Sequence, residues 1–161
     1  VCDGHEHIDK AIAVIGCDEQ GAAEALFLRT YSERITLLPR SFPELAADER
    51  EQLRAAGVRV IESPVVRHLP HADGFDIDLA DGERLRFDVV YPALGTQPRS
   101  GLARMLGLAI EEDGCIPADA LTGSAVPGLY CAGDVLVGLD QISVAMGHGA
   151  VAATKAHNWL R

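Results

Sequence analysis

The sequence predicts an α/β protein that begins with a parallel β-sheet and ends with one long helix. Two observations predict the first part. Short apolar runs alternate with helical patterns up to residue 62, and an Asp-Gly turn then joins two alternating runs. A third observation predicts the last part: an apolar run at 128–132 ends at Gly133-Asp134 and an alanine-rich segment follows it.

The first strand and helix enclose a turn that contains two glycines. Residues 11–15 (AIAVI) form a short apolar run, typical of a buried parallel strand, and 22–31 (AAEALFLRTY) have helical spacing. Gly16 and Gly21 bracket the turn, and a second strand is expected at 34–38. Strand, glycine turn and helix begin a dinucleotide-binding βαβ unit, so we expect a Rossmann-like three-layer nucleotide-binding domain.

The rest of this domain follows in order. A helix is expected at 45–57, where Gly57 stops it, and a third parallel strand at 58–62. The segment 64–87 predicts an antiparallel β-meander. Its strands and turns are expected at 65–69, 70–74, 75–80, 81–82 and 83–87. A last parallel strand at 88–94 ends the domain at Gly95.

One position of the glycine turn departs from the usual G-x-G-x-x-G/A pattern. Asp18 stands where the middle glycine normally lets the backbone approach a pyrophosphate. Two like charges about 4 Å apart repel by roughly 4 kcal/mol at an effective dielectric near 20, on the order of a thousandfold in affinity. Two outcomes stay open. Asp18 weakens or abolishes nucleotide binding, or it rotates towards solvent; in either case it can cap the following helix.

Two stretches near the end of the chain carry a family resemblance. Residues 126–134 (VPGLYCAGD) and 140–153 (DQISVAMGHGAVAA) resemble the C-terminal flavin-binding motif of the low-molecular-weight thioredoxin reductases. The resemblance covers nearly the whole chain and implies FAD and NAD(P)H as cofactors. It also implies that 1–95 is a NAD(P)H-binding-type domain and that 96–161 is the C-terminal segment of an FAD-binding domain.

The same resemblance assigns roles to residues of this second segment. In the family, the residue matching Asp134 hydrogen-bonds the FAD ribityl chain, and those matching Gln141 and Ile142 meet the flavin ring. We expect the helix from 141 to 160 to be largely buried, because the only charges are Lys155 within it and Arg161 directly after it. Gly133-Asp134 has a plainer interpretation as an ordinary turn after a strand.

Two further matches to the family, and a second departure from its pattern, lie elsewhere in the chain. Gly95-Thr96-Gln97-Pro98 matches its Gly-x-x-Pro motif, where the chain returns to the flavin domain. Asp113-Gly114-x-Ile116 matches a turn and short strand. Arg40 alone remains of the His-Arg-Arg-type cluster that binds the 2′-phosphate of NADPH. Arg40 therefore either contacts a phosphate or is a solvated charge.

The first residues resemble the end of the family's redox motif, in which two cysteines three apart precede Asp-Gly. The first cysteine would lie before Val1, so we expect the chain to be a piece of a longer flavoprotein. By resemblance, Cys2 attacks the flavin and Asp3 protonates the leaving thiol, which suits a thiolate with a carboxyl group in reach. The alternative is a lone exposed cysteine near a chain end.

Composition narrows the possible partners. The chain has 161 residues, 48% of them hydrophobic, and a net charge of 14 − 24 = −10, which argues against nucleic acid and anionic membrane surfaces. No apolar run reaches the roughly 18 residues of a transmembrane helix.

The four cysteines show no framework spacing, which favours a cytoplasmic protein with free thiols. His68 and His71 are expected to be solvated loop residues, and no metal site is predicted.

Three functions agree with these observations. The first is a flavoprotein that passes hydride from NAD(P)H through FAD to a disulfide on a small protein or small molecule. The second is a flavin dithiol oxidase that needs no pyridine nucleotide, which Asp18 and Pro39 favour. The third is a nucleotide-domain remnant with an interaction role. For the full-length protein we expect a homodimer.

Overall fold

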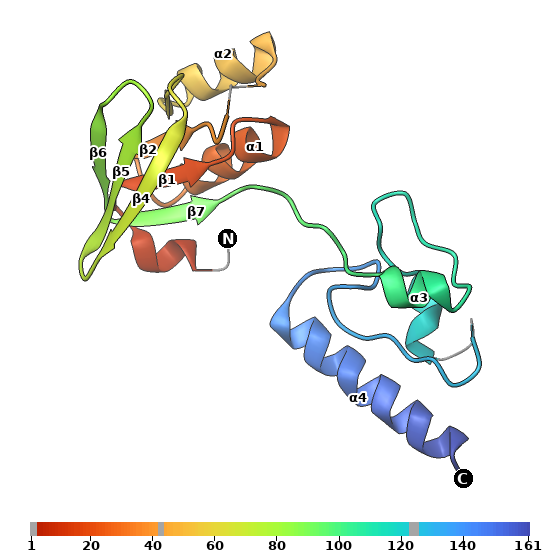
Figure 1. Cartoon of the computed structure of the whole chain (residues 1–161). Helices are drawn as coiled ribbons and strands as arrows, with labels where there is room; N and C mark the ends of the chain where they lie inside the picture. The colour runs from red at the N-terminus through yellow and green to blue at the C-terminus, as the bar shows by residue number, and fades with distance from the viewer. Residues whose placement is uncertain (1–2, 42–43, 123–125) are drawn as a thin grey trace. The chain divides into compact units, whose positions relative to one another are not determined.

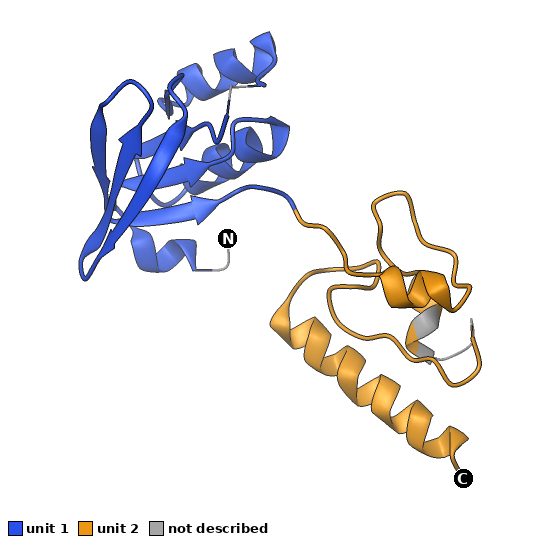
Figure 2. Ribbon diagram, in the orientation of Figure 1, with its two compact units in different colours: residues 1–95 blue, residues 96–161 orange. Residues whose placement is uncertain are grey.

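The computed structural model describes residues 3–41, 44–122 and 126–161 (Figure 1). The chain forms two compact units, Val1–Gly95 and Thr96–Arg161 (Figure 2). Cys2 lies outside the described residues. Within the described ranges, no helix is both long enough and apolar enough to cross a membrane.

Unit 1 is built on a parallel sheet of four strands in the order β3-β2-β1-β7. The strands are β1 (Ile12–Ile15), β2 (Ile35–Leu38), β3 (Arg59–Val60) and β7 (Val89–Pro92). Ile12 lies opposite Ile35 on one side and Val89 on the other, so β1 is central. Helix α1 (Glu19–Leu28) connects β1 to β2, and α2 (Ala47–Ala55) connects β2 to β3. The predicted βαβ order is confirmed, although β3 is shorter than the expected 58–62.

Three antiparallel strands form a second sheet in the order β4-β5-β6. They are β4 (Val65–His71), β5 (Gly74–Leu79) and β6 (Arg84–Phe87). The predicted turn at 70–74 is wrong in extent, because Pro70 and His71 still pair with β5 and only residues 72 and 73 form the turn. His68 and His71 are therefore exposed strand residues and not loop residues. The meander itself is confirmed.

Unit 1 has three layers because both faces of the parallel sheet are apolar. Ile12 and Val14 belong to a core shared with α1 and α2, whereas Ala13 and Ile15 belong to a core shared with the antiparallel sheet. Alternate side chains of a strand point to opposite faces, which explains this division. Figure 1 shows α1 and α2 on one side of the parallel sheet and β4–β6 on the other. The predicted α/β class and three-layer arrangement are confirmed.

Unit 2 contains α3 (Gly101–Met105), the 3-10 helix η2 (Ala118–Thr122) and α4 (Ile142–Trp159). The predicted strand at 128–132 is wrong, since these residues are in a turn and irregular structure. A strand is held by hydrogen bonds to a neighbouring strand, and the described part of unit 2 has only one isolated bridge, Ile116 to Leu136. The predicted burial of the last helix is also wrong, because α4 has one buried residue, Ala152.

Candidate functional site

The turn between β1 and α1 requires glycine at both of its ends. A Cβ atom on Gly21 would lie 1.7 Å from the carbonyl oxygen of Gly16, so the helix packs directly on the end of the strand. Gly16 has φ +140, and a Cβ there would lie 2.0 Å from the carbonyl oxygen of Ala93 in the segment after β7. These contacts are the close strand–helix packing that the dinucleotide-binding turn needs.

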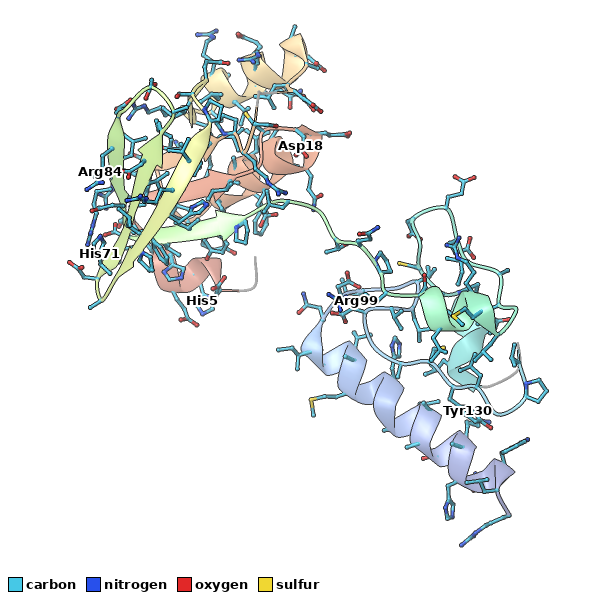
Figure 3. All side chains as sticks on the ribbon, viewed as in Figure 1. His5, Asp18, His71, Arg84, Arg99 and Tyr130 are labelled. Carbon is cyan, nitrogen blue, oxygen red and sulfur yellow. The ribbon has the colours of Figure 1, made fainter. Side chains whose placement is uncertain are left out.

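Asp18 occupies the N-terminal end of α1, where Figure 3 labels it. It is the N-cap residue, and its Oδ1 atom accepts a hydrogen bond of 2.8 Å from the backbone N–H of Gly21. The N-terminus of a helix attracts anions through its unpaired N–H groups and its dipole. The Asp18 carboxylate takes one of these donors and places its own negative charge at this end, so the capping that the sequence allowed for Asp18 is observed.

A pocket of about 190 Å³ lies beside this turn, at the carboxyl end of the parallel sheet. Its lining includes two carboxylate residues, Asp18 and Glu44, and one permanently charged cation, Arg40. A lining with two carboxylates and one cation is a poor match for a pyrophosphate, which carries two negative charges. Gly95 follows β7 with φ +73, and a Cβ on it would be 3.5 Å from the side chain of Gln20 in α1. The structure thus brings Gly16, Asp18, Gly21, Arg40 and Gly95 to one edge of unit 1.

Cys17 lies in the same turn, but its thiol is not a reactive one. Its side chain is buried, 7% exposed, and its backbone carbonyl accepts a hydrogen bond from the N–H of Glu44. Burial in the first place, and the nearby Glu62 carboxylate in the second, raise the pKa of the thiol to about 11. Reactive cysteines have a depressed pKa and are accessible, so Cys17 has a structural role.

The start of the chain packs against β7. Asp3 is exposed, and its Oδ1 atom accepts a hydrogen bond of 2.9 Å from the hydroxyl of Tyr91. Its Oδ2 atom lies 3.8 Å from Nε2 of His7, which is in the 3-10 helix η1 (Gly4–His7). Sequence reasoning identified Asp3 but missed Tyr91 and His7. Nothing in the spacing indicates a partner 88 positions away, and His7 sits in a stretch that carried no motif.

In unit 2, the Gly133-Asp134 pair forms a turn. The N–H of Leu136 donates to the carbonyl oxygen of Gly133 over 3.0 Å, and the N–H of Ile116 donates to that of Val135 over 2.8 Å. The family-like element at 113–116 therefore lies beside the turn. Asp134 lines a pocket of about 460 Å³ whose wall includes further polar residues, among them Thr96, Arg99, Cys115 and Asp140.

The N-terminus of α4 differs from that of α1. Gln141 is the N-cap residue, and its side chain makes no capping hydrogen bond to the helix. Ile142 begins the helix and is 82% exposed. The first N–H groups of a helix have no partner within the helix, so they are available to an acceptor outside it. A carbonyl oxygen or an anion suits this end.

Metal chemistry has no support from the described side chains. No group of three or more His, Cys, Asp or Glu residues in the described ranges is placed to hold a metal ion.

Comparison with known proteins links both units to one family. The family model described as pyridine nucleotide-disulphide oxidoreductase matches residues 4–149. The chain is 27% identical to a thioredoxin reductase of Peptoclostridium litorale over 177 aligned positions, which cover 99% of the chain and 55% of that relative. The chain spans about half the length of the curated relative it matches.

Solved structures also align with nearly the whole chain. The crystal structure of HlmI aligns with a TM-score of 0.82 and 30% identity, covering 98% of this chain and 50% of that one. An oxidoreductase from Agrobacterium tumefaciens aligns with a TM-score of 0.75 and 28% identity, covering 98% and 53%. A thioredoxin reductase from Streptococcus pyogenes, at 23% identity and a TM-score of 0.79, shares the fold and covers 98% and 55%.

Proposed function

Because the chain belongs to the pyridine nucleotide-disulphide oxidoreductase family, we propose that it is part of a flavoprotein that passes electrons between NAD(P)H, FAD and a disulfide or dithiol. The observation that carries this proposal is that one chain holds both a dinucleotide-type turn at Gly16 to Gly21 and, in unit 2, a helix whose N-cap side chain makes no capping hydrogen bond. The Cys2-Asp3-Gly4 sequence at the start of the chain supplies the redox group.

FAD, when bound, supplies two-electron chemistry that links a hydride donor to a thiol pair. On the proposed assignment, Asp134 accepts a hydrogen bond from a ribityl hydroxyl, and the first N–H groups of α4 face the flavin ring beside Gln141 and Ile142. Both lie in unit 2, and the N-cap side chain of α4 makes no capping hydrogen bond. This chain's part in the chemistry is to orient the flavin and, at Asp3, to protonate the leaving thiol.

The cap on α1 favours the second candidate function, an oxidase of small dithiols that works without a pyridine nucleotide. The Asp18 carboxylate is hydrogen-bonded at the helix end where the pyrophosphate of NAD(P)H would bind. Arg40 is then left without the 2′-phosphate role that the family pattern gives it. The electrons would flow from the dithiol through FAD to oxygen.

One pair of measurements on the flavin-loaded longer protein distinguishes the candidates. Anaerobic NADPH should bleach the yellow flavin absorbance if the first function holds. A dithiol in air should produce peroxide in proportion to the disulfide formed if the second holds. If neither occurs in protein that retains FAD, the proposal of an oxidoreductase fails and the interaction role of the nucleotide domain gains support.

The proposed partners follow from the same chemistry. We infer a small protein or small-molecule disulfide or dithiol as substrate, a cytoplasmic location that keeps the thiols reduced, and a homodimer for the longer protein. The net charge of −10 makes nucleic acid an unfavourable partner.

A further inference from the structure

A second cavity of unit 1, of about 360 Å³, is bounded by both of its sheets. Its size is that of cavities that take small molecules. Most of its lining is apolar and comes from the carboxyl end of the parallel sheet and from the antiparallel sheet. The lining residues are Ile15, Arg40, His68, Phe75, Val90, Pro92 and Leu94. We call this space the inter-sheet cavity.

Strand register explains why the antiparallel sheet leaves this space. His68 in β4 lies opposite Ile77 in β5, so the two side chains are on the same face of the sheet. Ile77 is fully buried in the core shared with the parallel sheet, whereas His68 is exposed. The parallel sheet therefore covers this face at Ile77 and not at His68. Phe75, two positions before Ile77, is on the same face and forms part of the wall.

Two polar side chains of the lining are available to a ligand. The guanidinium of Arg40 and the imidazole of His68 make no hydrogen bond or ion pair within the described ranges. Other charged side chains of the antiparallel sheet are paired, such as His71 with Asp76 at 3.0 Å. The inter-sheet cavity thus combines apolar walls with one permanent cation and one further hydrogen-bonding group, and none of its lining residues is a carboxylate.

We propose that the inter-sheet cavity binds a small aromatic molecule that carries one carboxylate group. The ring lies against Phe75 and Val90, and the carboxylate accepts hydrogen bonds from Arg40, whose fork of donors suits it. His68 is a second donor for the same group. Sugar hydroxyls of a nucleotide would find no partners on the apolar walls, which makes a nucleotide the less suitable ligand. The inference does not depend on the flavin chemistry proposed above.

The first test uses naphthoate as the probe and the 161-residue chain as the protein. Calorimetric titration should show saturable binding of one naphthoate per chain. Naphthamide has the same rings without the charge, so its dissociation constant should be about tenfold higher.

Methyl NMR locates the bound probe. The methyl resonances of Ile15 and Val90 should shift when naphthoate is added, because both residues line the inter-sheet cavity. Those of Val14 are the internal control. Val14 is on the same strand as Ile15 but belongs to the core on the helix side of the sheet, so its resonances should stay in place.

Two variants with matched controls test the polar contacts. Arg40→Gln should weaken naphthoate binding about five- to tenfold, whereas Arg67→Gln, next to His68 but on the opposite face of β4, should change it less than about twofold. His68→Gln should weaken binding about two- to threefold. Its control is His71→Gln, an exposed histidine of the same strand (Figure 3) that lies outside the lining. All four residues are exposed, so urea midpoints near that of the wild type are expected.

Four results would overturn the proposal. Naphthoate can fail to bind saturably, naphthamide can bind as tightly as naphthoate, Arg67→Gln can match Arg40→Gln, or the Ile15 and Val90 methyl groups can remain unshifted. NADPH that displaces naphthoate and shifts the same two methyl groups would also overturn it, because the cavity would then belong to the nucleotide site. None of these results bears on whether the flavin-loaded longer protein oxidises dithiols.

Discussion

Asp18 and Gly21 close the N-terminus of α1 by a 2.8 Å hydrogen bond from the Gly21 N–H to the Asp18 carboxylate. The bond stabilises the helix by about 1 kcal/mol, a typical contribution of an N-cap. The same bond fills a position at which a dinucleotide turn usually receives a phosphate. If unit 1 binds a nucleotide as proposed, capping of α1 and phosphate binding compete for this position.

The first prediction is that Asp18→Gly raises the affinity for NADPH by one to three decades. Removing the carboxylate takes away a repulsion of up to roughly 4 kcal/mol and frees the Gly21 N–H. Asp18→Asn is the matched variant, because Asn retains a good cap without the charge, and it should recover only the electrostatic part. Calorimetric titration of the longer protein measures both. Tight NADPH binding by the wild type would contradict the role given to Asp18.

The second prediction concerns Gly21. In Gly21→Ala the new Cβ would meet the Gly16 carbonyl oxygen at 1.7 Å, so α1 must move away from β1. We expect the free energy of unfolding to fall by about 3 kcal/mol or more, at the upper end of overpacking costs. Gly149→Ala in α4 is the control, since its Cβ would meet nothing within 4 Å. Urea denaturation checks both variants, and equal losses would rule out the close contact.

The third prediction uses the buried thiol of Cys17. Its pKa in the folded chain is about 11, above the ordinary value of 9.0. A group with a raised folded pKa contributes stability that is complete below its unfolded pKa and is lost as the pH rises towards the folded value. The chain should thus lose up to roughly 3 kcal/mol between pH 9 and 11 from this group. Cys17→Ala should flatten that part of the stability curve, and identical curves for both proteins would refute the assignment.

The fourth prediction is that the chain self-associates through the exposed face of α4. Ile142 and Met146 of α4 are 82% and 71% exposed, and Leu139, just before the helix, is 66% exposed. Exposed apolar patches of this kind promote contact between molecules. Replacing Ile142 and Met146 by Ser should lower the apparent mass in sedimentation over a concentration series. Val66→Ser, an exposed valine of the antiparallel sheet, should leave it unchanged.

The fifth prediction is that the 161-residue chain does not retain FAD through dialysis. Only one helix N-terminus and one carboxylate, at Gln141 and Asp134, are proposed to hold the flavin, and two such contacts give little affinity once the cost of binding is subtracted. Absorbance after dialysis gives the answer. Chain that stays yellow would mean that unit 2 holds the flavin through further contacts.

The sequence was sufficient to predict unit 1 because each of its strands has a partner in the same unit. Apolar runs such as 11–15 predicted strands, and the structure pairs them with one another. The same pattern at 128–132 predicted a strand wrongly. A local sequence pattern reports only how apolar a segment is, whereas a strand also needs a neighbouring strand to hydrogen-bond with. Unit 2 provides no such neighbour at 128–132 among its described residues.

The candidate site was predictable where it depends on neighbours in sequence. The Asp18 cap spans three residues, so the turn pattern was sufficient to expect it. The Tyr91 hydroxyl reaches Asp3 across 88 positions, and only the packing of η1 against β7 brings the two together. Burial of α4 was expected from composition, but a helix becomes buried only when another element covers it.

The central position of β1 has a consequence for how unit 1 opens. Its residues Ile12, Ala13 and Val14 have no exposed surface, and β2 and β7 pair with it on both sides. The amides of β1 can meet water only after the two sheets of unit 1, or the parallel sheet and its helices, have separated. Local fraying is therefore not enough to expose them. Amide hydrogens of β1 should therefore exchange with deuterium only by unfolding of the whole unit, and their rate reports the global stability of residues 1–95.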